Sequence, residues 1–271
     1  FLMAPDGDDF GRWEAGQRLA LRVMLRNLAG EAEGLDDRLS RAFGRVLNDR
    51  RLEPALIAEA LTLPSEEYLG EFLQEVDPAA VHGVRQSLRR ALADAHRDGL
   101  AAAYRSLTEL DAYRIDPDAM GRRRLKNLAL AYWTETGHDE AVATARRQFD
   151  GGQNMTDVQS ALTTLVHTGA AGHEEALEAF YQRWQDDALV LDKWFAIQAS
   201  SPVLGTVDRV SELMRHPAFT LSNPNRVRAV VASFARRNPV QFHAPDGSGY
   251  TFLADRVLEL DPRNPQLAAQ L

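Results

Sequence analysis

The sequence contains no cysteine, so disulfides and thiolate metal sites are excluded along all of its 271 residues. It has no run of 18 apolar residues, which is the length that predicts a membrane-spanning helix. It also lacks a basic surplus, since 31 Lys and Arg stand against 39 Asp and Glu for a formal net charge of −8. A nucleic-acid-binding protein would show a basic footprint. We therefore expect neither nucleic acid nor a membrane as partner, and a cytoplasmic location fits the absence of cysteine.

Recognisable catalytic motifs are missing as well. The sequence has no P-loop, no dinucleotide-binding glycine fingerprint and no G-x-S-x-G nucleophile elbow. The nearest approach to a zinc-protease helix is His173-Glu174-Glu175, but H-E-x-x-H needs a second histidine where Leu177 stands. We predict that this chain alone holds no catalytic residue, no metal and no cofactor.

What the sequence does contain is a succession of capped helical segments. An Asp or Asn followed by Pro is typical of a helix start and recurs at residues 77–78, 116–117 and 223–224. Apolar residues then follow with the helical period, and no run alternates apolar and polar residues between hairpin turns. The expected helices span residues 10–28, 36–48, 53–61, 64–73, 77–110 with a break or bend at Gly99, 116–137, 139–149, 156–168, 172–186, 189–199, 206–214, 224–238 and 249–260.

The spacing of these helices indicates the fold class. From Asp116 onward they come in pairs roughly 30–40 residues apart, the range of helical-hairpin repeats. We predict an all-α superhelix, a solenoid of antiparallel helix pairs like armadillo and HEAT repeats, as a single domain over residues 1–271. A compact, non-repeating helical bundle is the alternative.

The stretch 221–250 has features that core packing alone does not explain. Ser222 or Asn223 can cap a helix here, and four apolar residues at i, i+3, i+4 and i+7 predict one buried face: Val227, Val230, Val231 and Phe234. Arg226 and Arg228 flank this face in the first two turns, where a cation opposes the helix dipole. Such a placement suggests a nearby anion, whereas salt bridges with the many acids of the chain are the alternative.

Two further patterns have simpler interpretations. The run Arg122–Arg124 is expected to form a solvated helix face paired with acids, because the chain as a whole is acidic. All four tryptophans fall at core spacings and are expected to be packing residues: Trp13, Trp133, Trp184 and Trp194.

Both ends of the chain resemble a known family. The segments are DDFGRWEAGQRLA at 8–20 and, within 223–268, NPNRVR followed by SFARRNPVQFHAPDGSGYTFLADRVLELDPRNPQLA. They are similar to the C-terminal helical domain of bacterial aminopeptidase N, a zinc-dependent gluzincin aminopeptidase. The resemblance implies a parent enzyme of about four domains whose zinc ligands and catalytic base lie in a catalytic domain outside this chain. It also implies that this domain closes a chamber over that catalytic domain and over peptide substrates.

The resemblance also implies a site residue. An arginine of the NPNRVR block faces the C-terminal side of the substrate in this family, and Arg228 matches it by position, with Arg226 the weaker candidate. A second family arginine corresponds here to Gln270, so its role is not carried over. We expect this chain to be a fragment of a longer multidomain protein, without its last helices. The alternative function is a free-standing helical-repeat scaffold that binds a partner protein.

Overall fold

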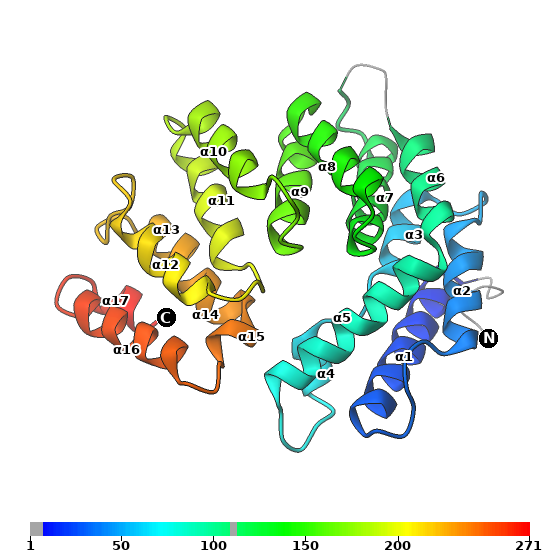
Figure 1. The fold of residues 1–271 in the computed structure, drawn as a ribbon, viewed down its shortest axis with the longest axis horizontal. Helices are drawn as coiled ribbons and strands as arrows, with labels where there is room; N and C mark the ends of the chain where they lie inside the picture. The colour runs from blue at the N-terminus through cyan, green and yellow to red at the C-terminus, as the bar shows by residue number, and fades with distance from the viewer. Residues whose placement is uncertain (1–7, 109–112) are drawn as a thin grey trace. The chain divides into compact units, whose positions relative to one another are not determined.

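The structure is a computed structural model that describes residues 8–108 and 113–271. Within these residues every regular element is helical, with seventeen α-helices, one π-helical turn and no strand (Figure 1). The expectation of an all-α fold is confirmed. The chain divides into two compact units, Phe1–Ala161 and Leu162–Leu271, with the division inside helix α9 (Met155–His167). The grouping of residues 1–271 as one domain stays a prediction.

The first unit is arranged around a central helix, α7. Its tyrosine Tyr132 is buried and donates a hydrogen bond of 2.8 Å to the carbonyl oxygen of Leu61. The neighbours that pack on α7 are α3, α5, α6 and α8. The helices of this unit are α1 (Asp9–Leu28), α2 (Asp37–Leu47), α3 (Pro54–Leu61), α4 (Glu66–Gly70), α5 (Pro78–Ala95), α6 (Arg97–Leu107), α7 (Pro117–Glu135), α8 (Asp139–Gly151) and the beginning of α9.

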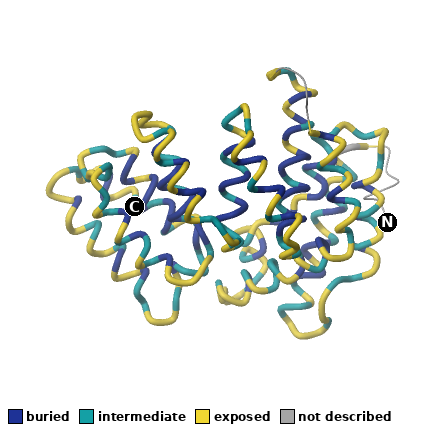
Figure 2. Tube along the Cα trace, turned by 45° about the horizontal axis from the view of Figure 1, so that its top comes forward, coloured by how far each residue is buried: buried dark blue, intermediate teal, exposed yellow. Residues whose placement is uncertain are grey.

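The second unit packs around α11, which contacts α12, the π-helical turn η1 and α14. Figure 2 shows buried residues recurring along the helices, as amphipathic segments require. The elements are the end of α9, α10 (His173–Trp184), α11 (Ala188–Ala199), α12 (Thr206–Arg215), α13 (Pro224–Val227), η1 (Arg228–Ala232), α14 (Ser233–Arg237), α15 (Pro239–Phe242), α16 (Ser248–Leu260) and α17 (Pro265–Ala268).

The expected break at Gly99 is wrong, because the long helix divides at His96. His96 leaves helical geometry with φ −121° and ψ 19°, while its ring stacks on Phe43 at 5.2 Å and its Nε2 lies 3.1 Å from Ser40 Oγ. Gly99 lies inside α6, where an added Cβ would come within 3.2 Å of Leu47 Cδ2. The glycine therefore serves close packing, whereas distant contacts set the break. The helix was expected to reach about residue 110, which lies outside the described residues.

The helix expected over residues 64–73 is shorter than predicted. It covers only α4, whose cap is Ser65 and whose first residue follows Pro64 by two positions. Only Leu69 is buried, whereas Tyr68 and Phe72 are 41% and 50% exposed and meet edge to face. The helical period of apolar residues over so short a stretch therefore overestimated the length of the helix and the burial of its aromatic side chains.

The two simpler interpretations hold only in part. Trp133 and Trp194 are buried core residues, but Trp13 is 36% exposed and Trp184 is half-buried. Of the basic run, Arg124 pairs with Glu59 as expected.

The middle arginine of the run contradicts the expectation of a solvated face. Arg123 is buried, with its guanidinium carbon 4.8 Å from the centre of the Tyr113 ring.

Candidate functional site

The helix that carries the candidate arginines begins as the sequence predicts. Asn223 caps it: its Oδ1 accepts hydrogen bonds from the backbone N–H of Asn225 at 3.0 Å and of Arg226 at 3.3 Å. Pro224 occupies the first turn, where its missing N–H costs nothing. The predicted face is confirmed, since its four members are all fully buried: Val227, Val230, Val231 and Phe234. The helix runs on through η1 and α14 until Asn238-Pro239 ends it.

A widened turn lies in the middle of this helix and begins at Arg228. The backbone N–H of Ser233 bonds to the carbonyl oxygen of Arg228, five residues back, and Ser233 Oγ donates to the same oxygen at 3.3 Å. Turns of this π type are rare and occur frequently at functional sites. The distortion therefore coincides with the residue that the family resemblance singles out.

Arg226 is a buried structural residue in this arrangement. It is 4% exposed, its Nε lies 2.9 Å from Asp192 Oδ1, and its guanidinium carbon is 4.8 Å from the centre of the Phe195 ring. Burial lowers the pKa of the Arg226 guanidinium, an effect that Asp192 partly offsets. Burial also raises the pKa of the Asp192 carboxyl, and Arg226 partly offsets that. Both groups thus lose hydration, and their pairing ties the start of this helix to α11.

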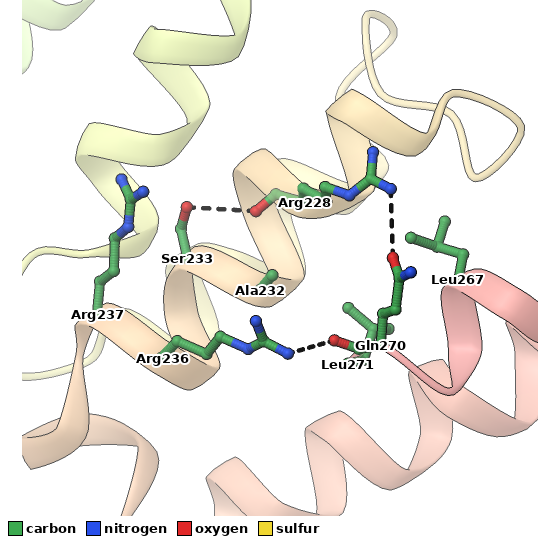
Figure 3. A pocket seen from close by; sticks show the side chains of 8 residues that line it. All are labelled: Arg228, Ala232, Ser233, Arg236, Arg237, Leu267, Gln270 and Leu271. Atoms are coloured by element: carbon green, nitrogen blue, oxygen red, sulfur yellow. Dashed lines mark hydrogen bonds between the residues drawn. The ribbon is translucent and has the colours of Figure 1, made fainter.

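Arg228, by contrast, is exposed and lines a cavity of about 290 Å³ together with Arg236 and Arg237 (Figure 3). Its two terminal nitrogens donate long hydrogen bonds of 3.4 Å, one to Asn225 Oδ1 and one to Gln270 Oε1. Arg236 donates to the backbone carbonyl oxygen of Gln270 on the facing segment.

The charged side chains that line this cavity are all cationic. None of its three arginines forms an ion pair within the described residues, and no Asp or Glu side chain lines it. A guanidinium is permanently charged and can hold a carboxylate through two parallel N–H···O bonds. The cavity can therefore bind a carboxylate or a similar anion.

Sequence reasoning identified Arg228 but missed Arg236 and Arg237. An undistorted α-helix returns to the same face after about 7 residues, two turns of 3.6. Arg236 is eight residues after Arg228, and the wider turn η1 lies between them, so both side chains reach the same cavity. The signal in the sequence was the SFARRNP run, but the π turn could not be read from it.

The glycine-rich loop after this helix has a structural explanation. His243 Nδ1 lies 2.7 Å from the Tyr250 hydroxyl, and Asp246 Oδ1 accepts the N–H of Ser248 at 2.9 Å. The bonds from Ser248 lower the pKa of the Asp246 carboxyl. A Cβ at Gly249 would lie 2.1 Å from a backbone carbonyl oxygen, so this corner closes only with glycine.

Residues 8–108 and 113–271 contain no group of three or more His, Cys, Asp or Glu that could hold a metal ion. No helix among them combines the length and the apolar character that crossing a membrane demands.

Comparison with known proteins shows which family and which relatives the chain is similar to. A family model described as "Domain of unknown function (DUF3458_C) ARM repeats" matches residues 1–271. The chain is 41% identical over 271 residues to aminopeptidase N of Caulobacter vibrioides, and 37% over 275 residues to aminopeptidase N of Escherichia coli. All of this chain is covered, but only 31% and 32% of those relatives, so it spans about a third of their length.

A solved structure shows the same fold. The crystal structure of Legionella pneumophila aminopeptidase A in complex with aspartic acid matches with a TM-score of 0.90 and 31% identity. The match covers 99% of this chain and 32% of that one.

Proposed function

The chain belongs to the DUF3458_C family of ARM-repeat domains, and on that basis we propose that it is a non-catalytic domain of a zinc aminopeptidase, an enzyme that removes N-terminal residues from peptides. The whole-length matches confirm the resemblance to the C-terminal helical domain of bacterial aminopeptidase N. The family description also favours the helical-repeat superhelix over a compact bundle. In this proposal the zinc and the catalytic groups belong to the catalytic domain of the parent enzyme. That catalytic domain is the partner of this chain, and the enzyme works in the cytoplasm.

A more specific role in substrate binding is supported by the cavity, which three arginines and no acidic side chain line. We propose that the domain encloses the active-site chamber and that Arg228 binds the carboxylate end of short peptide substrates. Its two present partners are neutral amide oxygens at 3.4 Å, which a carboxylate can replace with stronger, charge-assisted bonds. Arg226 contributes more weakly, because its buried pair with Asp192 holds the helix that presents Arg228.

The experiment is Arg228→Ala in the full-length enzyme, assayed on a tripeptide and on a chromogenic amide of one amino acid. The tripeptide has a carboxylate for Arg228 to bind, whereas the amide has none. We expect KM for the tripeptide to rise by about 1–3 kcal/mol in free-energy terms, as for a hydrogen bond between charged groups. KM for the amide should change little.

A matched control is Arg215→Ala, which removes an exposed arginine at the end of α12 that does not line the cavity. It should leave both substrates unaffected. If Arg228→Ala affects both substrates alike, or lowers the melting temperature instead, Arg228 is a structural residue and the carboxylate role is wrong.

A further inference from the structure

A second cavity, of about 380 Å³, lies in the first unit and has no place in the function proposed above. Its wall includes Lys126 from α7, Arg147 and Gln148 from α8, and Asp157 from the first turn of α9, together with Asn154, which directly precedes α9. Asn154 caps α9, since its Oδ1 accepts the backbone N–H of Asp157 at 2.9 Å.

Lys126 is a buried cation with hydrogen-bonding capacity to spare. Its Nζ donates to Asp157 Oδ2 at 2.6 Å, and both side chains are more than nine-tenths buried. The same carboxylate also accepts from Asn127 Nδ2 at 3.0 Å and from Asn154 Nδ2 at 2.9 Å. An ammonium has three N–H donors, and Asp157 is its one partner in the described residues. The carboxylate of Asp157 thus already accepts from three donors, whereas the ammonium of Lys126 keeps N–H donors to spare.

Gln148 leaves an acceptor unused on the same wall. Its Nε2 donates to Asn127 Oδ1 at 2.8 Å and to the carbonyl oxygen of Asp157 at 3.0 Å. Its Oε1 is buried and has no hydrogen-bond partner among the described residues. A buried acceptor without a donor is destabilising, and a ligand that supplies an N–H would remove that cost.

The charges of the wall favour a monoanion. Among the described lining residues Lys126 and Arg147 are cationic and Asp157 is anionic, so their charges sum to one positive charge. Arg147 is exposed, and its Nη2 donates to Thr144 Oγ1 at 2.7 Å, which holds it at this edge of the cavity. The half-buried ring of Tyr104 adds an aromatic surface.

We propose that this cavity binds a carboxylate whose neighbouring carbon bears an N–H donor, as in the C-terminal residue of a peptide or an N-acyl amino acid. The carboxylate accepts from Lys126 and Arg147, and the amide N–H donates to Gln148 Oε1. A free amino acid fits less well, because its ammonium would add a third positive charge beside Lys126 and Arg147. None of the residues that line the Arg228 cavity lines this one.

The probe for the test is N-acetyl-4-iodophenylalanine, used with the full-length protein. Its blocked amine removes the N-terminus on which an aminopeptidase acts, and its iodine can be located by anomalous diffraction in soaked crystals. Calorimetry compares its affinity with that of its methyl ester, which lacks the carboxylate, and with free 4-iodophenylalanine. We expect iodine in the cavity, and weaker binding of both comparison compounds.

The affinity of the probe for two variants tests whether it binds in this cavity. Arg147→Gln should weaken the probe on the order of tenfold, the effect of losing a charge-assisted bond at an exposed position. Arg146→Gln is the matched control, because it removes the same charge from the adjacent position, where the arginine pairs with Asp150, and should change nothing. Equal affinity for the methyl ester, an unchanged affinity in Arg147→Gln, or no iodine in the cavity would overturn the proposal. Iodine found only beside Arg228 would also overturn it, while leaving the proposed function intact.

Discussion

The substitution Arg226→Ala separates the structural arginine of the candidate helix from the exposed one. It removes a guanidinium that lies 2.9 Å from Asp192 Oδ1 and 4.8 Å from the centre of the Phe195 ring. It leaves the Asp192 carboxylate without its cation in a place where burial already raises its pKa. We expect a clear loss of stability.

The size of that loss follows from burial. Removing one partner of a fully buried pair costs about 3–5 kcal/mol. The side chain of Asp192 keeps 18% of its exposure, so water recovers part of this cost, while that of Arg226 keeps only 5%. The lost contact with the Phe195 ring adds about 1 kcal/mol. Together these effects predict a decrease of about 3 kcal/mol in the free energy of unfolding.

The assay is urea denaturation followed by tryptophan fluorescence, because Trp194 packs on Phe195 with ring centres 4.9 Å apart. The exposed control Arg215→Ala should change the free energy of unfolding by no more than about 0.5 kcal/mol. The double variant Arg226→Met with Asp192→Leu should lose less than Arg226→Ala alone, since no charge is left buried. A loss below about 1 kcal/mol for Arg226→Ala would refute this reasoning.

Three other outcomes follow from the structure. Gly249→Ala should lower the free energy of unfolding by about 1–3 kcal/mol in urea denaturation, because the new methyl group meets the carbonyl oxygen of Phe242 at 2.1 Å. Asp157→Asn should lower it by about 3 kcal/mol by leaving Lys126 charged, buried and unpaired; an unchanged midpoint would contradict this. Acid titration of stability should show a loss as the pH falls from about 4 toward 2, which Asp192, whose pKa is raised, partly opposes. That loss comes from carboxyls whose pKa is lowered from 3.8 to about 2, mainly by hydrogen bonds from neighbouring arginines: Asp36, Asp49 and Asp116.

Local chemistry made much of the fold predictable. Asp77, Asp116 and Asn223 each precede a proline, and each side chain accepts a backbone N–H of the helix that it opens. Such caps depend only on neighbouring residues, so a sequence reveals them. The buried face beginning at Val227 was predictable for the same reason, because its period reflects a single helix.

Features that depend on distant residues were not predictable. The break at His96 depends on contacts with Ser40 and Phe43, more than 50 positions earlier. The partner of Arg226 is 34 positions away in α11, and nothing in the local sequence selects Asp192 from the other acids. The π turn that brings Arg236 beside Arg228 is likewise set by packing, so only one of the three arginines of the cavity could be predicted from the sequence.

The activity and size of the full-length natural protein test the central claim most directly. Since this chain spans about a third of its aminopeptidase N relatives, we predict a polypeptide about three times its 30.1 kDa. We also predict that this polypeptide releases N-terminal residues from peptides and loses that activity when its metal is chelated. A natural protein of about 30 kDa without peptidase activity would contradict the account and favour a free-standing helical-repeat scaffold.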